Sequence, residues 1–140
     1  KMIQKQKDLI PNKHLNRVSF KCISVEDFKT DQNYDLICTH FFWDCFSHRE
    51  ISTFLPHFIK FLKQDGFWIN SDFVDIKNGE MKLNFFKIRL LYLFFGVTTG
   101  ILARRVEPFY QHAFKNSLQL IDYSEIRSNF IRSEVFKKVA

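Results

Sequence analysis

The sequence predicts one α/β domain, built on a mostly parallel sheet that ends in a C-terminal antiparallel hairpin. Tyr34–Phe42 follows turn-forming residues and is almost wholly apolar, which is typical of a strand buried on both faces. An amphipathic helix and a second apolar strand follow it with short joints, which is the order of a parallel βαβ unit. Two alternating stretches near the end, 118–127 and 130–139, predict the hairpin.

The first thirty or so residues predict a helix, a strand and a loop. Residues 1–10 carry apolar side chains at three- and four-residue spacings, so we expect a short amphipathic helix that ends at Pro11. Val18–Ile23 alternates apolar and polar residues, which predicts a strand, and 24–28 forms the loop after it.

The βαβ unit contains clear helix signals. Ser47 and Glu50 have the spacing of a capping box, and Pro56 is expected to kink the helix or split it in two. Gly66 is expected to end the helix in the left-handed conformation, before a second buried strand at Phe67–Phe73. The apolar stripe of the helix comprises Ile51, Phe54, Leu55, Phe58, Ile59 and Leu62.

Polar and aromatic residues gather where the two strands end. His40, Phe41, Phe42 and Asp44 come from the carboxyl end of the first strand, and Asp72 lies near the carboxyl end of the second. Open α/β sheets bind ligands beyond the carboxyl ends of their strands. We therefore expect a binding site at this edge.

A strongly apolar stretch at 81–102 has almost the length of a membrane span. Three charges interrupt its first half, and a charge within a span costs roughly 2.5–3.5 kcal/mol. We prefer a helix that covers the site as a lid, followed by a short helical region through about Lys115. Contact with a membrane surface or a lipid-like substrate stays open.

The charge, cysteine and histidine content of the chain argues against some classes of function. The net charge of +6 is spread along the chain without a zinc-finger or RNA-recognition signature, so we expect no nucleic-acid partner. Three cysteines without metal-ligand spacing, at Cys22, Cys38 and Cys45, predict buried thiols in a reduced, cytoplasmic setting and no metal site. Three histidines without ligand spacing are expected at the surface, namely His48, His57 and His112.

Two short sequence motifs, and their order along the chain, resemble a known protein family. Tyr34-Asp35-Leu36-Ile37 and Leu62-Lys63-Gln64-Asp65-Gly66-Phe67, followed by the hairpin, resemble the class I S-adenosylmethionine-dependent methyltransferases, with their Rossmann-like sheet. Val18–Phe28 is similar to the third strand and its loop in that family. The resemblance implies that 1–140 is a partial methyltransferase domain whose first two strands and Gly-rich loop are missing, with 81–115 as a substrate-covering insertion. Residues 1–30 are then expected to be poorly anchored, or to borrow the edge of another chain.

The resemblance also implies the site. Ser24, Val25 and Glu26 would face the adenine of S-adenosylmethionine, unless they form a plain solvated loop. His40, Phe41 and Phe42 would line the sulfonium side, because aromatic faces favour a cation, although core packing explains the two Phe nearly as well. Contacts with the methyl acceptor are expected from Asp44, Asp72 and Tyr92.

Methyl transfer needs orientation more than acid–base help, so we expect no catalytic residue, although His40 could act as a base. The alternative for Asp44 is that it caps a helix. The alternative for Asp72 is that it is a solvated carboxylate at the end of a strand.

The sequence thus predicts methyl transfer to a small or lipid-like acceptor by a fragment that holds the cofactor weakly alone. A non-catalytic methyltransferase-like remnant or interaction module is the alternative. No transmembrane span is expected, and the oligomeric state stays open.

Overall fold

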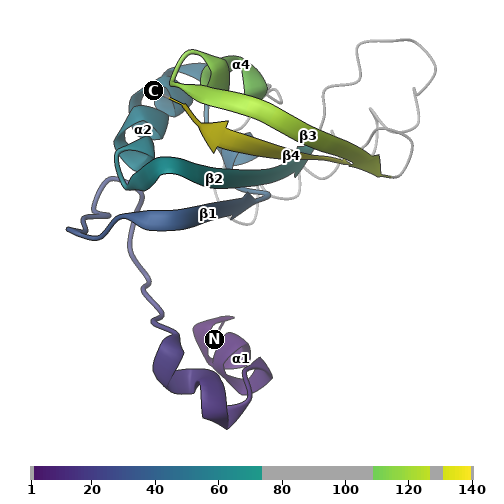
Figure 1. Ribbon diagram of the computed structural model, residues 1–140. Helices are drawn as coiled ribbons and strands as arrows, with labels where there is room; N and C mark the ends of the chain where they lie inside the picture. Colours follow the sequence, from purple (N-terminus) through teal and green to yellow (C-terminus); the bar gives the residue numbers. More distant parts are fainter. Residues whose placement is uncertain (1, 74–108, 127–130, 140) are drawn as a thin grey trace.

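The computed structural model describes residues 2–73, 109–126 and 131–139, and the arrangement below concerns those residues (Figure 1). The predicted N-terminal helix is present, and the predicted βαβ unit follows it along the chain. The elements are α1 (Met2–Leu9), the 3-10 helix η1 (Asn12–Arg17), β1 (Tyr34–His40), the 3-10 helix η2 (Trp43–Cys45), α2 (His48–Ile59), β2 (Leu62–Phe73), α4 (Phe109–Phe114), β3 (Leu118–Ile126) and β4 (Ile131–Lys138).

The four strands form one sheet in the order β1-β2-β4-β3. β1 and β2 run parallel, with Leu36 beside Phe67 and His40 beside Ser71. β4 is antiparallel to both β2 and β3. The parallel pair and the antiparallel pairing of the last two predicted strands are therefore confirmed, while the turn predicted at 128–129 lies outside the described residues.

Helix α2 begins with the predicted capping box. The Ser47 hydroxyl accepts the backbone N–H of Glu50 at 3.4 Å, and the Glu50 carboxylate accepts the N–H of Ser47 at 2.8 Å. Pro56 lies inside the helix, which continues to Ile59, so the predicted split is wrong. Proline removes one helical donor, and the carbonyl left without it belongs to Ser52, an exposed residue that water can reach.

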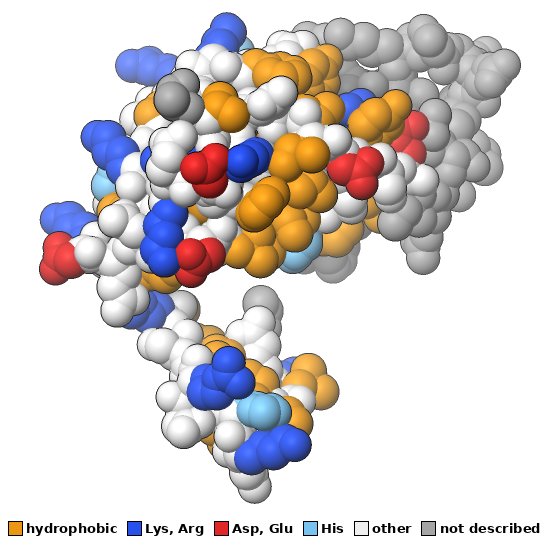
Figure 2. Space-filling view, viewed as in Figure 1, with side chains coloured by type: hydrophobic (Ala, Val, Ile, Leu, Met, Phe, Trp, Pro, Cys, Tyr) orange, Lys and Arg blue, Asp and Glu red, His pale blue; other side chains and the backbone are white. Residues whose placement is uncertain are grey.

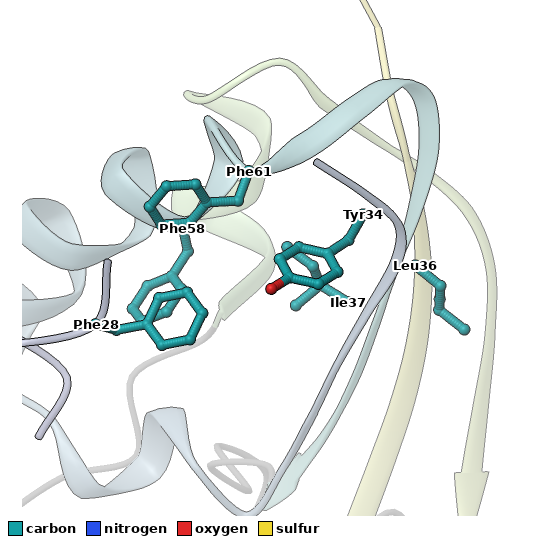
Figure 3. A pocket seen from close by; sticks show the side chains of 6 residues that line it. All are labelled: Phe28, Tyr34, Leu36, Ile37, Phe58 and Phe61. Atoms are coloured by element: carbon teal, nitrogen blue, oxygen red, sulfur yellow. The ribbon is translucent and has the colours of Figure 1, made fainter. Parts of the chain in front are cut away.

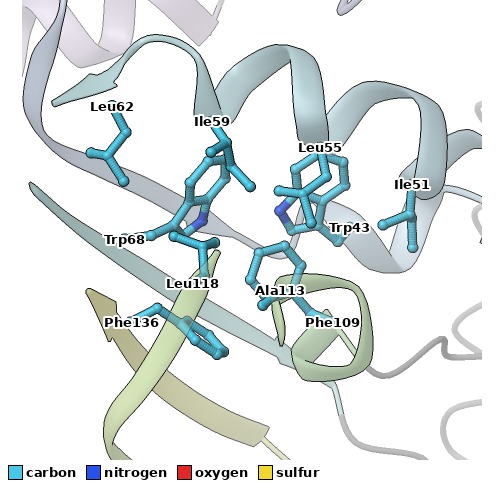
Figure 4. Close-up of a cluster of buried hydrophobic side chains, with 10 residues drawn as sticks. All are labelled: Trp43, Ile51, Leu55, Ile59, Leu62, Trp68, Phe109, Ala113, Leu118 and Phe136. Atoms are coloured by element: carbon cyan, nitrogen blue, oxygen red, sulfur yellow. The ribbon is translucent and has the colours of Figure 1, made fainter. Parts of the chain in front are cut away.

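One hydrophobic core lies between α2, α4 and one face of the sheet (Figure 4). Trp43 joins these elements, because its ring stacks on Phe109 at 5.6 Å and lies 6.2 Å from Trp68. The buried hydrophobic side chains are Trp43, Ile51, Leu55, Ile59, Leu62, Trp68, Phe109, Ala113, Leu118 and Phe136.

The opposite face of the sheet is open among the described residues. Leu36 and Phe67 stand side by side there and are 48% and 44% exposed. Hydrophobic side chains gather on the face of the sheet domain seen in Figure 2. The prediction that Tyr34–Phe42 is buried on both faces is therefore wrong. The strand ends at His40 and is one of the two outermost described strands. Its Ile37 packs against the core that α2 covers.

The joint between α2 and β2 also differs from its prediction. Between the pairs Tyr34–Leu62 and Leu36–Phe67, β2 advances five residues while β1 advances two, so β2 bulges. Asp65, not Gly66, takes the left-handed φ of 62°. Gly66 is needed for space instead, because a Cβ there would lie 2.9 Å from the carbonyl oxygen of Lys63.

The N-terminal arm, residues 2–27, lies apart from the sheet in Figure 1. Its predicted strand at Val18–Ile23 is wrong as a description of this chain, because the segment forms no ladder with any described strand. Phe28 anchors the end of the arm. The His57 ring nitrogen Nε2 lies 3.1 Å from the Phe28 carbonyl oxygen, and the Phe28 ring packs on Phe58 and Phe61.

Two composition-based predictions also need correction. Cys22 and Cys38 are exposed rather than buried, because the arm and the open face leave them uncovered. His112 is buried rather than on the surface, since α4 turns it toward α2. Its Nδ1 lies 3.3 Å from the Ser52 hydroxyl, and its ring lies 4.5 Å from that of His48.

Candidate functional site

The carboxyl ends of β1 and β2 lie together because the strands run parallel. Just past β1, Phe41 takes a left-handed φ of 49° and donates its N–H to the Ser71 carbonyl at 2.8 Å. A bulky residue at positive φ is uncommon, and such strain often marks a functional turn. The Phe41 ring is 48% exposed and lies 5.0 Å from the ring of Phe73. Two aromatic rings from adjacent strand ends thus form an accessible apolar surface.

Asp72 holds the turn that follows. Its Oδ2 accepts the backbone N–H groups of Trp43 at 3.1 Å and Asp44 at 3.2 Å, which are the first residues of η2. Its Oδ1 accepts the N–H of Phe73 at 3.2 Å. Carboxylate oxygens suit the exposed N–H groups at the start of a helical turn. The structure therefore gives Asp72 a positioning role for the end of β1.

Asp44 and Asp72 form a buried pair of acids. Burial, and after it the charge of Asp44, raises the pKa of Asp72 to about 7. Burial raises the pKa of Asp44 as well, although hydrogen bonds with the side chains of Cys45 and Asp72 oppose the rise. Burial, followed by the Asp44 charge, also raises the pKa of the Cys45 thiol to about 12. Asp72 is therefore partly protonated near neutral pH, while the Cys45 thiol stays protonated.

A row of buried polar groups crosses the sheet on the core face. Trp68 Nε1 donates to the Thr39 hydroxyl at 3.0 Å, and that hydroxyl donates to Asn70 Oδ1 at 2.9 Å. Asn70 in turn hydrogen bonds the side chain of Glu134, which stands opposite it on β4. Burial raises the pKa of Glu134, against the charge of Arg132 and the bond from Asn70.

Arg132 ends this row. Its Nε lies 3.0 Å from Glu134 Oε1, although the N–H does not point at that oxygen, and its Nη1 lies 3.7 Å from Glu125 Oε1. The guanidinium lies 4.3 Å from the ring centre of Tyr123 and 5.6 Å from that of Tyr110. Cation–π contacts of this kind fix an arginine in place.

Sequence reasoning missed Asn70, Glu134 and Arg132 as members of one polar row. The signal was the period of two within each strand, which places Asn70 on the face of Trp68 and Glu134 on the face of Phe136. The pairing of β2 with β4 could not be derived from that period, because the turn between β3 and β4 does not specify which strand lies beside β2.

The structure brings only some of the predicted site residues together. Phe41 lies at the strand ends, Phe42 packs on Trp43 and Phe46 beside them, and His40 is exposed next to Ser71. Asp44 and Asp72 lie beneath the same turn. Tyr92 and the predicted lid at 81–102 lie outside the described residues.

The predicted adenine loop lies elsewhere. The Ser24 hydroxyl donates to Asp27 Oδ2 at 2.7 Å in an exposed turn, Val25 is half-buried and Glu26 is exposed. The chain then reaches Phe28, which lines the same pocket as Tyr34 at the beginning of β1. A strand of this length separates its ends by about 20 Å. Within one chain, Ser24–Glu26 and His40–Phe42 therefore do not form one pocket.

A small apolar cavity of about 190 Å³ lies at the beginning of β1 (Figure 3). The Tyr34 hydroxyl lies 3.4 Å from the Thr30 hydroxyl nearby. The lining residues are Phe28, Tyr34, Leu36, Ile37, Phe58 and Phe61. Its aromatic lining suits an apolar side chain better than a charged ligand.

The described residues contain no group of three or more potential metal ligands. No helix among them is long and apolar enough to cross a membrane.

Neither a protein-family model nor a curated protein sequence matches the chain. Solved structures match its fold. LepI in complex with SAM has a TM-score of 0.68 at 12% identity, over 99% of this chain and 34% of its own. Magnesium protoporphyrin IX methyltransferase (ChlM) from Synechocystis PCC 6803, with bound SAH, has a TM-score of 0.61 at 15% identity, over 97% of this chain and 57% of its own.

The N-methyltransferase NodS from Bradyrhizobium japonicum WM9 has a TM-score of 0.57 at 12% identity, over 91% of this chain and 65% of its own. The chain thus spans between 34% and 65% of the length of these three proteins. At such identities the likeness shows the fold alone, an α/β fold that the chain shares with these three proteins.

Proposed function

We propose that the chain forms part of an S-adenosylmethionine-dependent methyltransferase domain that acts on a small or lipid-like acceptor. The sheet order β1-β2-β4-β3 carries this proposal, because it combines a parallel βαβ unit with a last strand inserted antiparallel. The fold neighbours support it, since ChlM and NodS are named methyltransferases and LepI was solved with SAM.

The strand ends fit one side of the cofactor. The exposed ring of Phe41 beside Phe73 offers aromatic faces to a sulfonium, which is the group that carries the transferable methyl. Phe42 supports this surface from the core side. Asp44 and Asp72 shape the turn below it and would orient the acceptor through that turn. His40, exposed at the strand end, would be the proposed group to take the proton of a hydroxyl or amine acceptor.

The adenine side does not fit within one chain, because Ser24–Glu26 lies at the other end of β1. The chain alone is therefore expected to bind S-adenosylmethionine with a Kd in the millimolar range. Substitution Phe41→Ala should weaken that binding at least about fivefold, because a cation–π contact contributes about 1 kcal/mol or more.

Isothermal titration calorimetry with S-adenosylmethionine tests the proposal. Phe114→Ala is the matched control, since Phe114 is exposed on α4 and was never assigned to the site. If the Phe41 and Phe114 variants bind S-adenosylmethionine equally well, the Phe41 ring takes no part in cofactor binding. No heat at millimolar cofactor, at any protein concentration, would remove the enzyme proposal.

The alternative is a methyltransferase-like interaction module without catalysis. One observation favours it, namely that the oxygens of Asp72 are already engaged by three backbone N–H groups. A folded chain that binds no cofactor but still associates with itself would support this alternative.

A further inference from the structure

Arg132 lies at the same edge of the sheet as the candidate site. Because β4 runs antiparallel to β2, its first residues stand beside the carboxyl end of β2, and Arg132 is opposite Asp72. On the other side of β4, Arg132 is opposite Glu125 of β3. Only β2 separates β4 from β1, so two strand spacings, about 10 Å, lie between the backbone of Arg132 and the end of β1. A small molecule can span that distance.

Two tyrosine rings hold the guanidinium of Arg132 in place. Its central carbon lies 4.3 Å from the ring centre of Tyr123 on β3 and 5.6 Å from that of Tyr110 on α4. The Arg132 side chain nevertheless keeps 24% of its surface exposed. A side chain that is already fixed loses little conformational freedom when it binds a ligand. Arg132 is therefore both ordered and accessible.

The hydrogen-bonding capacity of this guanidinium is poorly used within the described part of the chain. Its Nε is buried without an aligned hydrogen bond, although Glu134 Oε1 lies 3.0 Å away. Its Nη1 lies 3.7 Å from Glu125 Oε1, which is too long for a hydrogen bond. The Glu125 side chain is 28% exposed, and ion pairs near the surface contribute little to stability. A better acceptor can therefore replace Glu125.

The other acids in this region are engaged or buried. The Asp72 oxygens accept three backbone N–H groups. Glu134 is 4% exposed and hydrogen bonds the side chain of Asn70. Arg132 is thus the charged group that can meet a ligand here once Glu125 turns away. A guanidinium forms its strongest pairs with carboxylates, which it binds through two parallel N–H groups.

We propose that Arg132 binds a carboxylate of the methyl acceptor, which is therefore an apolar acid, and that Glu125 turns toward solvent to admit it. Tyr123 is 54% exposed and offers its ring to the apolar part of the acid. The identity of this ligand as a methyl acceptor rests on the proposed function, whereas binding of a carboxylate at Arg132 is tested without cofactor. Arg132 holds the acid and takes no part in the transfer itself.

NMR titration with model acids tests the ligand class. The probes are octanoate and benzoate, compared with octan-1-ol, benzyl alcohol and octylamine. Each acid should bind more tightly than its alcohol. Arg132→Gln should weaken binding of both acids at least about fivefold, because a charge-assisted pair is lost, and should leave the alcohols unchanged. Tighter binding of octylamine than of octanoate would overturn the proposal, as would alcohols that bind as well as the acids.

Glu125→Gln gives a test that does not depend on a loss. It removes the carboxylate that competes for Arg132 and should tighten binding of both acids at least about threefold. Asp122→Asn is the matched control, because it removes the same charge from β3. Asp122 is opposite Val135, next to Glu134 and thus on the other face of the sheet, so this variant should bind the acids like wild type. Equal effects of the two substitutions would refute a site at Arg132.

The two proposals fail separately. If the acids respond to Glu125→Gln as expected but S-adenosylmethionine does not bind, the carboxylate site stands and the proposed function fails. If S-adenosylmethionine binds in a Phe41-dependent manner but neither acid binds the Glu125 variant, only the carboxylate site fails. Circular dichroism verifies the fold of each variant, and Glu125→Gln decides alone if Arg132→Gln does not fold.

Discussion

Protonation of Asp72 makes the stability of the protein depend on pH. Its folded pKa of about 7 lies above the ordinary value of 3.8, so the folded state holds a proton that the unfolded state releases between these values. The contribution of Asp72 to the free energy of unfolding is therefore complete below pH 3.8. It falls as the pH rises and is lost above about pH 7.

Asp72→Asn should flatten that pH dependence while keeping an oxygen for the N–H groups of Trp43 and Asp44. Each unit by which the folded pKa is raised corresponds to about 1.4 kcal/mol of unfolding free energy. The wild type should therefore lose on the order of 2–4 kcal/mol of stability between pH 4 and 8. Urea denaturation across that range measures the loss. Asp31→Asn, at an exposed carboxylate, should leave the slope unchanged, and an unchanged slope in the Asp72 variant would contradict the assignment.

Two adjacent residues in the β2 bulge should lose different amounts of stability on substitution. Gly66→Ala would place a Cβ 2.9 Å from the Lys63 carbonyl oxygen, and we expect a loss of about 1–3 kcal/mol. Asp65→Gly should cost less than about 1 kcal/mol, since glycine accepts its left-handed φ freely while the exposed ion pair with Lys137 contributes little. Thermal unfolding of both variants checks the order, and the reverse order would show that the bulge depends on the Asp65 conformation instead.

At the scale of elements, α2 depends on its first turn. Ser47→Ala removes the acceptor for the Glu50 N–H and should destabilise the protein by about 1 kcal/mol. Thr53→Ala is a suitable control, because Thr53 is exposed later in the same helix and alanine favours helices. Chemical denaturation compares the two, and equal stabilities would mean that packing of Ile51 and Leu55 alone fixes the start of the helix.

The sequence signals for α2 and the parallel pair were local and strong, so both could be predicted. The capping box at Ser47, the stripe at Ile51, Leu55 and Ile59, and the apolar run at Phe67–Phe73 each act within a few residues. The exposed face of β1 could not be predicted, because burial of Leu36 depends on neighbours that lie far away in sequence or in another molecule.

The candidate site was predictable only in part for the same reason. Phe41 and Asp72 follow from their positions at strand ends, since parallel strands bring those ends together. Their roles depend on details that no spacing encodes, such as the left-handed φ of Phe41 and the three N–H groups around Asp72. Val18–Ile23 has strand propensity, but a strand also needs a partner with free backbone groups.

At the scale of the whole molecule, the arm and the sheet should behave as separate units at low concentration. Lys13, Arg17 and Lys21 are exposed in the arm, outside the core. Trypsin at submicromolar protein should therefore cut there before it cuts at Lys60 or Lys63 of the described domain. Mass spectrometry of the early products measures the order of cleavage.

Cleavage at Lys60 or Lys63 before the arm would contradict this separation.

The place of β4 has a consequence for how the chain is made. β4 follows β3 in the chain yet lies between β2 and β3, and its Lys138 donates to the carbonyls of Ile59 and Leu62 where α2 ends. During synthesis, β3 leaves the ribosome before β4, the strand it pairs with. The carbonyls of Ile59 and Leu62 at the end of α2 gain their bonds from Lys138 only later. The sheet is therefore completed only after translation has passed Lys138, and a nascent chain stalled before Ile131 would expose β2 and β3 to chaperones as two unpaired edges.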